Sequence, residues 1–457
     1  MSSLKTLLPL LTSLAIPLTL NAVPALGAPY CGLIPSSSAS AASATPTNTG
    51  CLAAAANSTG RIAATWYAGW EASKFPLQNV SWSKYTHVIY SFAITADDGT
   101  AQLEDSDATL IPSFVELAHE NNVKAILSVG GWGGSRFFSS NVATEQNRTN
   151  FAQSLLGLVS QYGLDGLDFD WEYPNGDGIG CNTKDASDAS NLLSLLQELR
   201  ADPAGGNLTL SAATSIKPWT GPDGTPLTDV SQFSQVLDFI SIMNYDVWGS
   251  WSSSLGVGPN APLNDTCAPT ADQQGSAVSA LSAWTAASFP ISQIVLGVAS
   301  YGHSFSVTPT NAIDSSTGEL KEAGYPAFDA ANQPSGDSWD AQGGTGETDS
   351  CGNAVTTGGV FNFWGLMEGG FLSENGTAKE GILYRFDECS QTPYVYNSNT
   401  QVMVSYDDAT SFSSKGKFIA ENGLAGFSMW QAGGDSNDIL LDSIRQAVSD
   451  NGGSGNC

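Results

Sequence analysis

The sequence contains few charged residues, and few of those are basic. Only 13% of its 457 residues are Asp, Glu, Lys or Arg, and 16 Lys and Arg stand against 44 Asp and Glu, which gives a formal net charge of -28. A surface this acidic repels the phosphates of nucleic acids and of anionic lipid headgroups. We therefore expect no nucleic-acid partner and no membrane partner, whereas a neutral or cationic ligand is compatible with the charge.

Residues that commonly bind metals are also scarce. The three histidines, His87, His119 and His303, are far apart in the sequence, and no two cysteines form a Cys-x-x-Cys pair. Zinc sites usually draw on such closely spaced ligands. We therefore expect neither a metal nor a cofactor.

Beyond the N-terminus, the sequence has no apolar segment long enough to span a bilayer. Residues 1–27 combine Lys5, an apolar run and small residues, a pattern typical of a secretory signal peptide. A membrane anchor is the alternative, but Pro9 and Pro17 interrupt the short run. We expect a secreted, extracellular protein. Six Asn-x-Ser/Thr sequons, which fit a glycoprotein, begin at Asn57, Asn79, Asn147, Asn207, Asn264 and Asn375.

The seven cysteines are most simply explained as disulfide partners, since a secreted protein meets an oxidising environment. An odd number leaves at least one cysteine free or paired between chains. Sequence alone does not fix the connectivity. The pairing we expect is Cys31–Cys51, Cys181–Cys267 and Cys351–Cys389, which leaves Cys457.

Strand-like and helix-like segments alternate along most of the chain, after a Ser-, Ala- and Thr-rich lead-in at 28–60. Eight short β-branched or apolar runs lie at 61–67, 87–93, 124–131, 166–172, 208–214, 238–246, 294–300 and 424–430. Amphipathic segments of helix length lie at 112–121, 147–162, 187–200, 272–287 and 436–450. This alternation predicts a parallel (β/α)8 barrel. A doubly wound open sheet is the rival, but no Gly-x-Gly-x-x-Gly turn follows the first run.

The seventh and eighth runs are separated by far more chain than one crossover helix needs. We therefore expect an inserted subdomain at 304–404. The barrel itself is then made of 61–303 and 405–450, and 451–457 is a short C-terminal tail.

The fourth run, in the stretch LDGLDFDWEYP, carries three acids on one face. Asp168, Asp170 and Glu172 alternate with apolar residues, so the three carboxylates share one side of a strand. A solvated edge strand is the ordinary explanation of such a pattern, and a calcium loop is disfavoured because Tyr173 stands where that loop needs Gly. In a barrel, however, the apolar face meets the helices and the acids point inward. Crowded acids cannot all ionise there, and Glu172 lies last, at the end of the strand where active sites of such barrels lie.

Other strand ends add aromatic and glycine residues near the same rim, in SVGGWGGS at 128–135 and MNYD at 243–246. Any single aromatic is more simply explained as a core residue. Several of them around one acid cluster suit a carbohydrate cleft, because aromatic faces stack on sugar rings. The candidate substrate-binding residues are Tyr67, Trp70, Phe92, Gly131, Trp132, Met243, Asp246, Trp251 and Trp430.

These motifs resemble those of glycoside hydrolase family 18, the chitinases. DGLDFDWE resembles the family's DxxDxDxE signature with Asp165 as its first residue, and SVGGW, MNYDVWGSW, GPNAPL, YDDATSF and GFSMW resemble its other motifs. The resemblance implies a TIM barrel with an α+β insertion between strands seven and eight, and a deep, tunnel-like cleft. Two departures concern the binding subsites: His303 stands where the family often has Arg, and Trp66 or Tyr67 where it often has Tyr.

The resemblance also implies a retaining, substrate-assisted mechanism. Glu172 is then the general acid and base, and the substrate's own 2-acetamido carbonyl is the nucleophile. Asp170 holds the acetamide N–H, Asp168 shares a proton with Asp170, and Tyr245 hydrogen-bonds the acetamide oxygen. Asp165, out of phase with the other acids, is expected to be structural.

The function we expect is that of a monomeric, secreted chitinase that binds chitin and chitooligosaccharides. A non-catalytic chitin-binding lectin on the same barrel is one alternative, although such proteins usually lack the acid that Glu172 supplies here. An endo-β-N-acetylglucosaminidase acting on N-glycans is another. The expected insertion and the supply of aromatics favour linear chitin over N-glycans.

Overall fold

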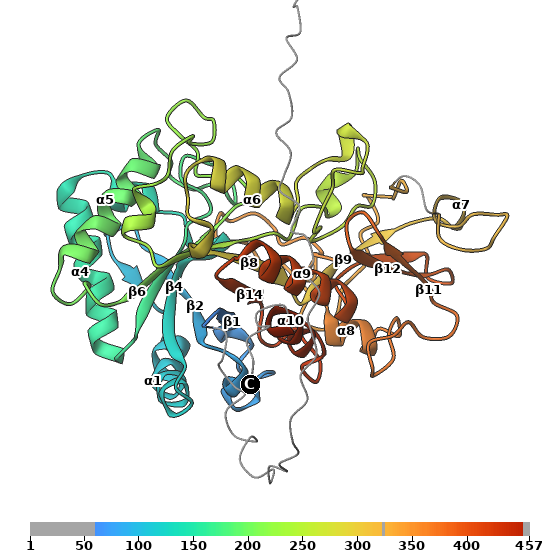
Figure 1. The fold of residues 1–457 in the computed structure, drawn as a ribbon, viewed down its shortest axis with the longest axis horizontal. Coiled ribbons are helices and arrows are strands. Elements are labelled where there is room, and N and C mark those ends of the chain that lie inside the picture. The colour runs from blue at the N-terminus through green and yellow to red at the C-terminus, as the bar shows by residue number, and fades with distance from the viewer. Residues whose placement is uncertain (1–59, 322–324, 451–457) are drawn as a thin grey trace, which may run out of the picture. The chain divides into compact units, whose positions relative to one another are not determined.

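A closed barrel of eight parallel strands forms the centre of the protein (Figure 1). The computed structural model describes residues 60–321 and 325–450, so the predicted signal peptide, most of the lead-in and the tail lie outside the described residues. The strand order is β1-β14-β8-β7-β6-β5-β4-β2, and β2 pairs with β1 to close the barrel. The barrel strands are β1 (Ile62–Ala68), β2 (His87–Thr95), β4 (Lys124–Gly130), β5 (Gly166–Asp170), β6 (Thr209–Thr214), β7 (Phe239–Ile242), β8 (Ile294–Ala299) and β14 (Gly426–Trp430). The predicted fold is confirmed, and each predicted run overlaps one barrel strand.

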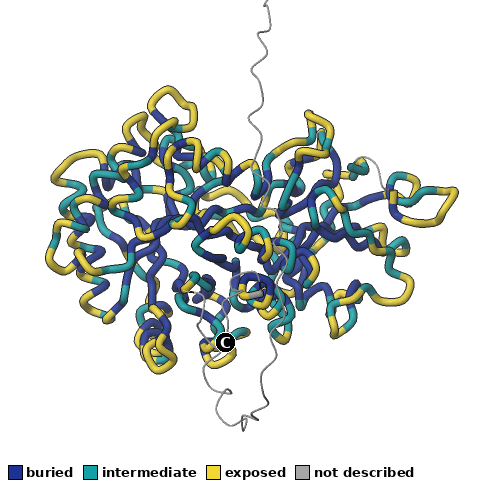
Figure 2. Tube along the Cα trace, in the orientation of Figure 1, coloured by how far each residue is buried: buried dark blue, intermediate teal, exposed yellow. Residues whose placement is uncertain are grey.

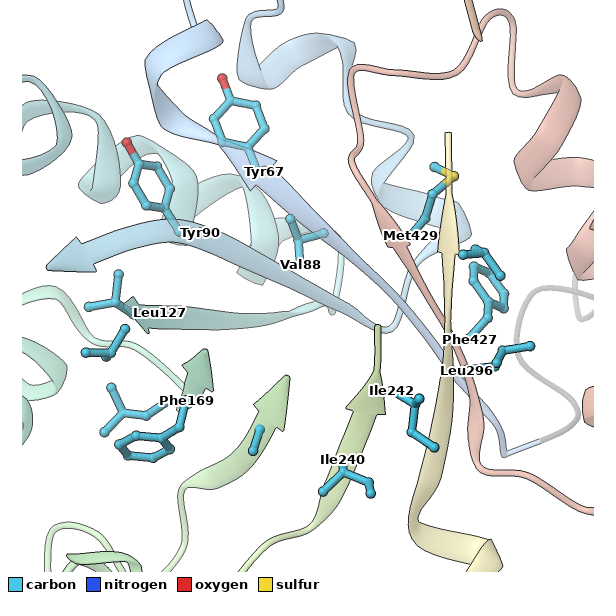
Figure 3. Packing of buried hydrophobic residues seen from close by; sticks show 14 of the residues in the cluster. Tyr67, Val88, Tyr90, Leu127, Phe169, Ile240, Ile242, Leu296, Phe427 and Met429 are labelled. Carbon is cyan, nitrogen blue, oxygen red and sulfur yellow. The ribbon is translucent and has the colours of Figure 1, made fainter. Parts of the chain in front are cut away.

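The barrel strands are buried on both faces, with an apolar outer face and an inner face that also carries polar residues such as Ser128, Asp168 and Ser211. Side chains on the outer face, such as Val88, Leu127 and Phe169, pack in one cluster with the surrounding helices (Figure 3). A smaller interior cluster includes Trp66 and Ile89 and draws on five barrel strands. The burial colouring shows the barrel strands in dark blue and many of the outer loops in yellow (Figure 2). Such two-sided burial is typical of parallel sheets.

Helices cover the outside of the barrel. The longer ones are α1 (Asp105–Glu120), α4 (Glu145–Tyr162), α5 (Asp188–Ala201), α6 (Ala277–Ala286), α9 (Ala409–Asn422) and α10 (Ile439–Asp450). The short ones are α2 (Gly131–Gly134), α3 (Phe138–Val142), α7 (Pro309–Ala312) and α8 (Phe363–Glu368). Single 3-10 turns are η1 (Gly69–Glu71), η2 (Leu77–Asn79), η3 (Trp82–Lys84), η4 (Phe233–Gln235), η5 (Ser250–Ser252), η6 (Thr270–Asp272) and η7 (Ile291–Gln293).

Capping residues set the limits of these helices. The side chain of Thr144 accepts the N–H of Asn147 at the start of α4, and Gly163, in the left-handed conformation, ends that helix. The predicted segment starts at residue 112, but helix α1 begins seven residues earlier, so that Pro112 lies inside the helix. Its first turn carries Asp105 and Asp107, whose charges are favourable at a helix N-terminus.

A second, antiparallel sheet is inserted between β8 and β14, as predicted. Its order is β10-β9-β13-β12-β11, and its strands are β9 (Tyr301–Ser306), β10 (Val360–Asn362), β11 (Leu383–Asp387), β12 (Thr392–Asn397) and β13 (Val402–Ser405). A short strand, β3 (Ala101–Gln102), pairs with the end of β2. The insertion has its own small core around Phe305 and Tyr396. The boundaries at 304 and 404 stay a prediction, and the second sheet runs from Tyr301 to Ser405.

The disulfides differ from the expected pairing. Cys181 is bonded to Cys351, and Cys267 to Cys389. The expected pairs Cys181–Cys267 and Cys351–Cys389 are therefore wrong. The bonded cysteines are separated by 170 and 122 positions in the sequence, and only the fold brings them together. The remaining cysteines, Cys31, Cys51 and Cys457, lie outside the described residues.

Within the described ranges, no helix combines the length and the apolar character needed to cross a membrane.

Candidate active site

The three acids of LDGLDFDWEYP lie where strand parity predicts. Asp168 and Asp170 are on β5 and are buried, whereas Leu167 and Phe169 belong to the cluster beneath the helices. Glu172 follows two residues after the strand ends. The acid row therefore runs from the barrel interior to the C-terminal rim.

Asp168, the innermost acid, is surrounded by hydrogen-bond donors. The hydroxyl of Ser211 donates to its Oδ1 at 2.6 Å, and Ser128 Oγ and Trp66 Nε1 donate to its Oδ2 at 2.9 and 3.3 Å. Burial raises the pKa of Asp168, and these three donors oppose that effect. No hydrogen bond joins Asp168 to Asp170 in the part of the chain that the structure describes, so the expected shared proton has no direct path here.

Asp170, the middle acid, has the opposite surroundings. Its Oδ1 is buried and has no hydrogen-bond partner. Burial, followed by the charges of Glu172 and Asp168, holds the pKa of Asp170 well above its usual range. Asp170 is therefore the acid in the row that most favours a proton, and its Oδ1 has an unused capacity to accept a hydrogen bond.

Glu172 has a pKa suited to proton transfer near neutrality. Burial raises the pKa of Glu172 to about 7, and the negative charge of Asp246 contributes in the same direction. The backbone beside it is held by Ser135, whose hydroxyl accepts the N–H of Glu172 at 3.0 Å. Asn182 Nδ2 donates to the carbonyl of Glu172 at 2.7 Å, which fixes the other side of the same residue.

Asp246 joins the barrel to the inserted sheet. Its Oδ1 accepts hydrogen bonds from Tyr301 Oη and His303 Nε2, both at 2.7 Å. Both partners lie on β9, the first strand of the insertion, and His303 is buried. The ring of His303 also meets Trp251 edge-on, with centroids 5.3 Å apart. His303 thus makes contacts on two sides at the position where the sequence departs from the usual Arg.

Aromatic rings surround the acid row. Trp70, Phe92 and Trp430 form a stack, with 5.9 Å between the first pair of centroids and 5.8 Å between the second. Trp132 and Trp251 are 53% and 59% exposed, far more than a core role would allow. All five rings belong to predicted substrate-binding residues, and that role stays a prediction. Trp70, Trp132 and Trp251 are the exposed ones among them.

Three further predicted site residues, Tyr245, Met243 and Gly131, contact the interior of the barrel or the aromatic residues described above, whereas Tyr67 does not. Tyr245 is half-buried and meets Tyr301 at 6.1 Å between ring centroids. Met243 packs against the interior cluster of the barrel, and Gly131, with φ of 74°, is where an added Cβ would collide with the ring of Phe92.

Tyr67 is the exception, and its prediction as a substrate-binding residue is wrong. It is 1% exposed, its hydroxyl donates to the carbonyl of Phe75 at 2.9 Å, and it packs beside Tyr90 beneath the helices (Figure 3). Adjacent residues of a strand point to opposite faces. Trp66, not Tyr67, therefore faces the acids, where it donates to Asp168.

Asp165, the first acid of the signature, directly precedes β5 and makes structural contacts. Asp165 accepts the backbone N–H of Ala125 at 2.8 Å and lies near His119 Nε2 and Lys124 Nζ, at 2.9 and 3.3 Å. Burial raises the pKa of Asp165, but the backbone and side-chain donors together outweigh it, so its pKa lies below the usual value. It ties the start of β5 to β4, away from the rim. No group of three or more His, Cys, Asp or Glu residues that could hold a metal occurs in the described ranges.

Comparison with known proteins shows the family of this chain. Residues 63–435 match the family described as Glycosyl hydrolases family 18. The chain belongs to this family. The resemblance drawn from its motifs is therefore confirmed.

Its relatives in family 18 include both enzymes and proteins named for another role. A chitinase-like effector of Moniliophthora roreri is 50% identical over 397 residues, covering 87% of this chain and 95% of the relative. Chitinase A1 of Niallia circulans is 30% identical over 337 residues, which is 71% of this chain and 42% of that protein. Among solved structures, a chitinase from Rhizomucor miehei aligns with a TM-score of 0.75 at 31% identity, covering 85% of this chain and 100% of the other.

Several residues at this family 18 site were not found from the sequence. Ser128 and Ser211 pair in register with Asp168 on the neighbouring strands, so parity combined with strand order could have indicated them. Ser135 and Asn182 lie in loops with no comparable pattern. Tyr301 reaches Asp246 only because the insertion folds back onto the barrel.

Proposed function

We propose that this protein is a chitinase that hydrolyses β-1,4-linked N-acetylglucosamine polymers with retention of configuration. The observation that carries the proposal is the carboxyl group of Glu172, at the rim end of a buried acid row, with a pKa of about 7. A glutamic acid with that pKa holds a proton for a leaving group at neutral pH and accepts one in the next step. The aromatic rings around it supply the stacking surfaces for a chain of sugars.

In the first step, the Glu172 proton passes to the glycosidic oxygen as its bond to the anomeric carbon breaks. The carbonyl oxygen of the substrate's own 2-acetamido group forms the new bond to that carbon, which gives an oxazolinium ion. Asp170 accepts the acetamide N–H through its Oδ1, which has no other hydrogen-bond partner, and Tyr245 donates to the acetamide oxygen. The family's use of the substrate as nucleophile is an exception to the usual pair of carboxylates.

In the second step, the carboxylate of Glu172 takes a proton from water. The resulting hydroxide attacks the anomeric carbon from the face that the leaving group vacated, and the oxazolinium ring opens. Glu172 is again protonated, and the configuration is retained after two inversions. Asp168, whose carboxylate is held by three donors, lies beneath Asp170, and its charge favours a proton on Asp170.

We further propose that the protein is secreted and acts as a monomer outside the cell. The N-terminal sequence favours a signal peptide, and the two disulfides favour an oxidising compartment. Chitin and its oligosaccharides are neutral polymers, which are compatible with a net charge of -28.

The test is product analysis with chitohexaose on the wild type and on Glu172→Gln. We expect short N-acetylglucosamine oligomers with initial β-configuration from the wild type, and a loss of at least about 10³-fold in kcat for the variant with hexamer binding retained. Glu120→Gln, an exposed glutamate at the end of α1, is the matched control and should remain active. Normal turnover by Glu172→Gln would overturn the mechanism.

A second candidate function is chitooligosaccharide binding without hydrolysis. It is favoured by one observation: two relatives at 50% and 51% identity, from Moniliophthora roreri and Moniliophthora perniciosa, are named chitinase-like effectors. The same hexamer assay distinguishes the two, because binding without any product at pH 5 to 7 would support this candidate. The intact acid row is the reason that hydrolysis is preferred.

A further inference from the structure

One segment of the insertion is attached to both the insertion and the opposite side of the barrel. Residues 340–358, called the strap below, form a β-hairpin-like arm. Gly358 N donates to Ala341 O at 3.1 Å, Val355 N to Glu347 O at 3.0 Å, and Thr348 pairs with Ala354. These bonds keep the two halves of the strap side by side along its length.

The base of the strap is held near the end of β14. Asp340 Oδ2 accepts the N–H groups of Gly336 and Gly359, both at 2.8 Å. The ring of Trp339, which directly precedes the strap, lies 5.0 Å from that of Trp364. Trp364 Nε1 in turn donates to the carbonyl of Gly433, three residues after β14, at 2.9 Å. The base is thus fixed to the C-terminal end of β14.

The tip of the strap is held at the ends of β4 and β5. Cys351 forms a disulfide with Cys181, and Arg136 donates to the carbonyl of Ser350 at 3.2 Å. Cys181 directly precedes Asn182, which binds the carbonyl of Glu172. The tip is therefore bonded to the loop that follows the general acid.

These two attachment points lie across the barrel from each other. In the closed strand order, three strands separate β14 from β5 in either direction. The paired part of the strap, eight residues long from Ala341 to Thr348, spans about 26 Å, and a barrel of eight tilted strands is roughly 15 Å across. The strap is therefore long enough to cross the mouth.

Between its ends, the strap does not pack on the barrel. Residues 341–348 are all exposed, and residues 351–358 are exposed or half-buried. Trp70 and Trp132, on the loops after β1 and β4, are also more than half exposed, so the strap does not rest on them. An arm that is bonded at both ends and solvated between them bridges an opening.

We propose that the strap crosses above the acid row and is latched by Cys181–Cys351, so that a polysaccharide occupies a closed passage and enters by threading a free end. This rests on the proposed binding of chitin chains. An enzyme with such a passage acts from the chain ends of the polymer. Of the two disulfides in the described residues, only Cys181–Cys351 serves as the latch. Opening the latch would admit an uninterrupted chain from the side.

The test uses a chitooctaose carrying biotin at one end or at both ends, saturated with streptavidin as a stopper. Binding is measured in a Glu172→Gln background, so that it is independent of hydrolysis. We expect the singly stoppered octamer to bind and the doubly stoppered one to bind at least about tenfold more weakly. Adding Cys181→Ser and Cys351→Ser should remove this difference, whereas Cys267→Ser with Cys389→Ser, the matched control, should preserve it.

Each outcome decides between the alternatives. Equal binding of both ligands with the latch intact overturns the strap proposal. If the latch variants unfold, judged by thermal unfolding, residues 344–356 are replaced by two glycines, and that variant must bind both ligands. A latch variant that folds and still excludes the doubly stoppered ligand overturns the role of the disulfide. Failure of the singly stoppered octamer to bind overturns the proposed function, and the strap proposal with it.

Discussion

The hydroxyl group of Ser135 connects two members of the acid row. It accepts the backbone N–H of Glu172 at 3.0 Å and lies 3.0 Å from the carbonyl oxygen of Asp170, to which it can donate. Ser135 is fully buried, in the loop after β4. One side chain, from the residue that follows α2, therefore sets the position of the backbone on both sides of Trp171, just after β5 ends.

Replacing Ser135 by Ala should lower kcat on chitohexaose with little change in KM. The variant leaves the buried N–H of Glu172 without its partner, which costs about 1–3 kcal/mol. If this cost is expressed at the transition state, kcat falls roughly 5- to 160-fold. Steady-state kinetics measure the change. Ser140→Ala, in the short helix that follows, is the control, since its hydroxyl donates only to a helix carbonyl. An equal rise in KM with unchanged kcat would assign Ser135 to binding instead.

The alkaline limit of activity should lie near pH 7. Glu172 must be protonated to act as the acid, and burial raises its pKa to about 7, so kcat/KM should fall as the pH rises through this value. The charge of Asp246 contributes to the raised pKa. Asp246→Asn should therefore move the alkaline limb to lower pH, by less than about one unit because Asp246 is half exposed. A shift to higher pH would contradict this assignment.

Lys415 and Asp407 form an ion pair with no exposed side-chain surface, 2.5 Å apart, between the last strand of the insertion and α9. Lys415→Met should lower the free energy of unfolding by about 3–5 kcal/mol, because it leaves a buried carboxylate without its partner. Urea unfolding at pH 7 measures this. Adding Asp407→Leu should restore most of the loss, and Lys417→Met, exposed on the same helix, should have little effect. A small loss for Lys415→Met alone would show that Asp407 is neutral.

Trp251 is an exposed ring beside His303 and should contribute to binding without supporting the fold. Trp251→Ala should weaken hexamer binding by about 2- to 12-fold, the equivalent of one aromatic contact of 0.5–1.5 kcal/mol. Trp251→Phe, which keeps a smaller ring, should lose less. Titration calorimetry in the Glu172→Gln background gives both values, and an unchanged thermal midpoint confirms that folding is unaffected. Equal loss in both variants would argue against stacking.

The sequence by itself determined the barrel and most of the acid row. Eight runs of strand-forming residues alternating with helices require a parallel sheet covered on both faces, and that cover forces the acids of β5 inward. The two-residue period placed Asp168, Asp170 and Glu172 on one face without knowledge of any other strand. Local rules were sufficient there because the information lies within one strand.

The tertiary structure decided what depends on separate strands and on the insertion. Trp66 rather than Tyr67 faces the acids because the start of β1 sets its parity, and that start could not be placed to within one residue from the sequence. Ser135 meets Glu172 from a segment with no regular period, and His303 meets Asp246 from a strand of the insertion. The disulfide between Cys181 and Cys351 joins residues 170 positions apart. Such contacts follow from how the chain closes on itself, since residues distant in sequence become neighbours only when the barrel and its insertion are packed together.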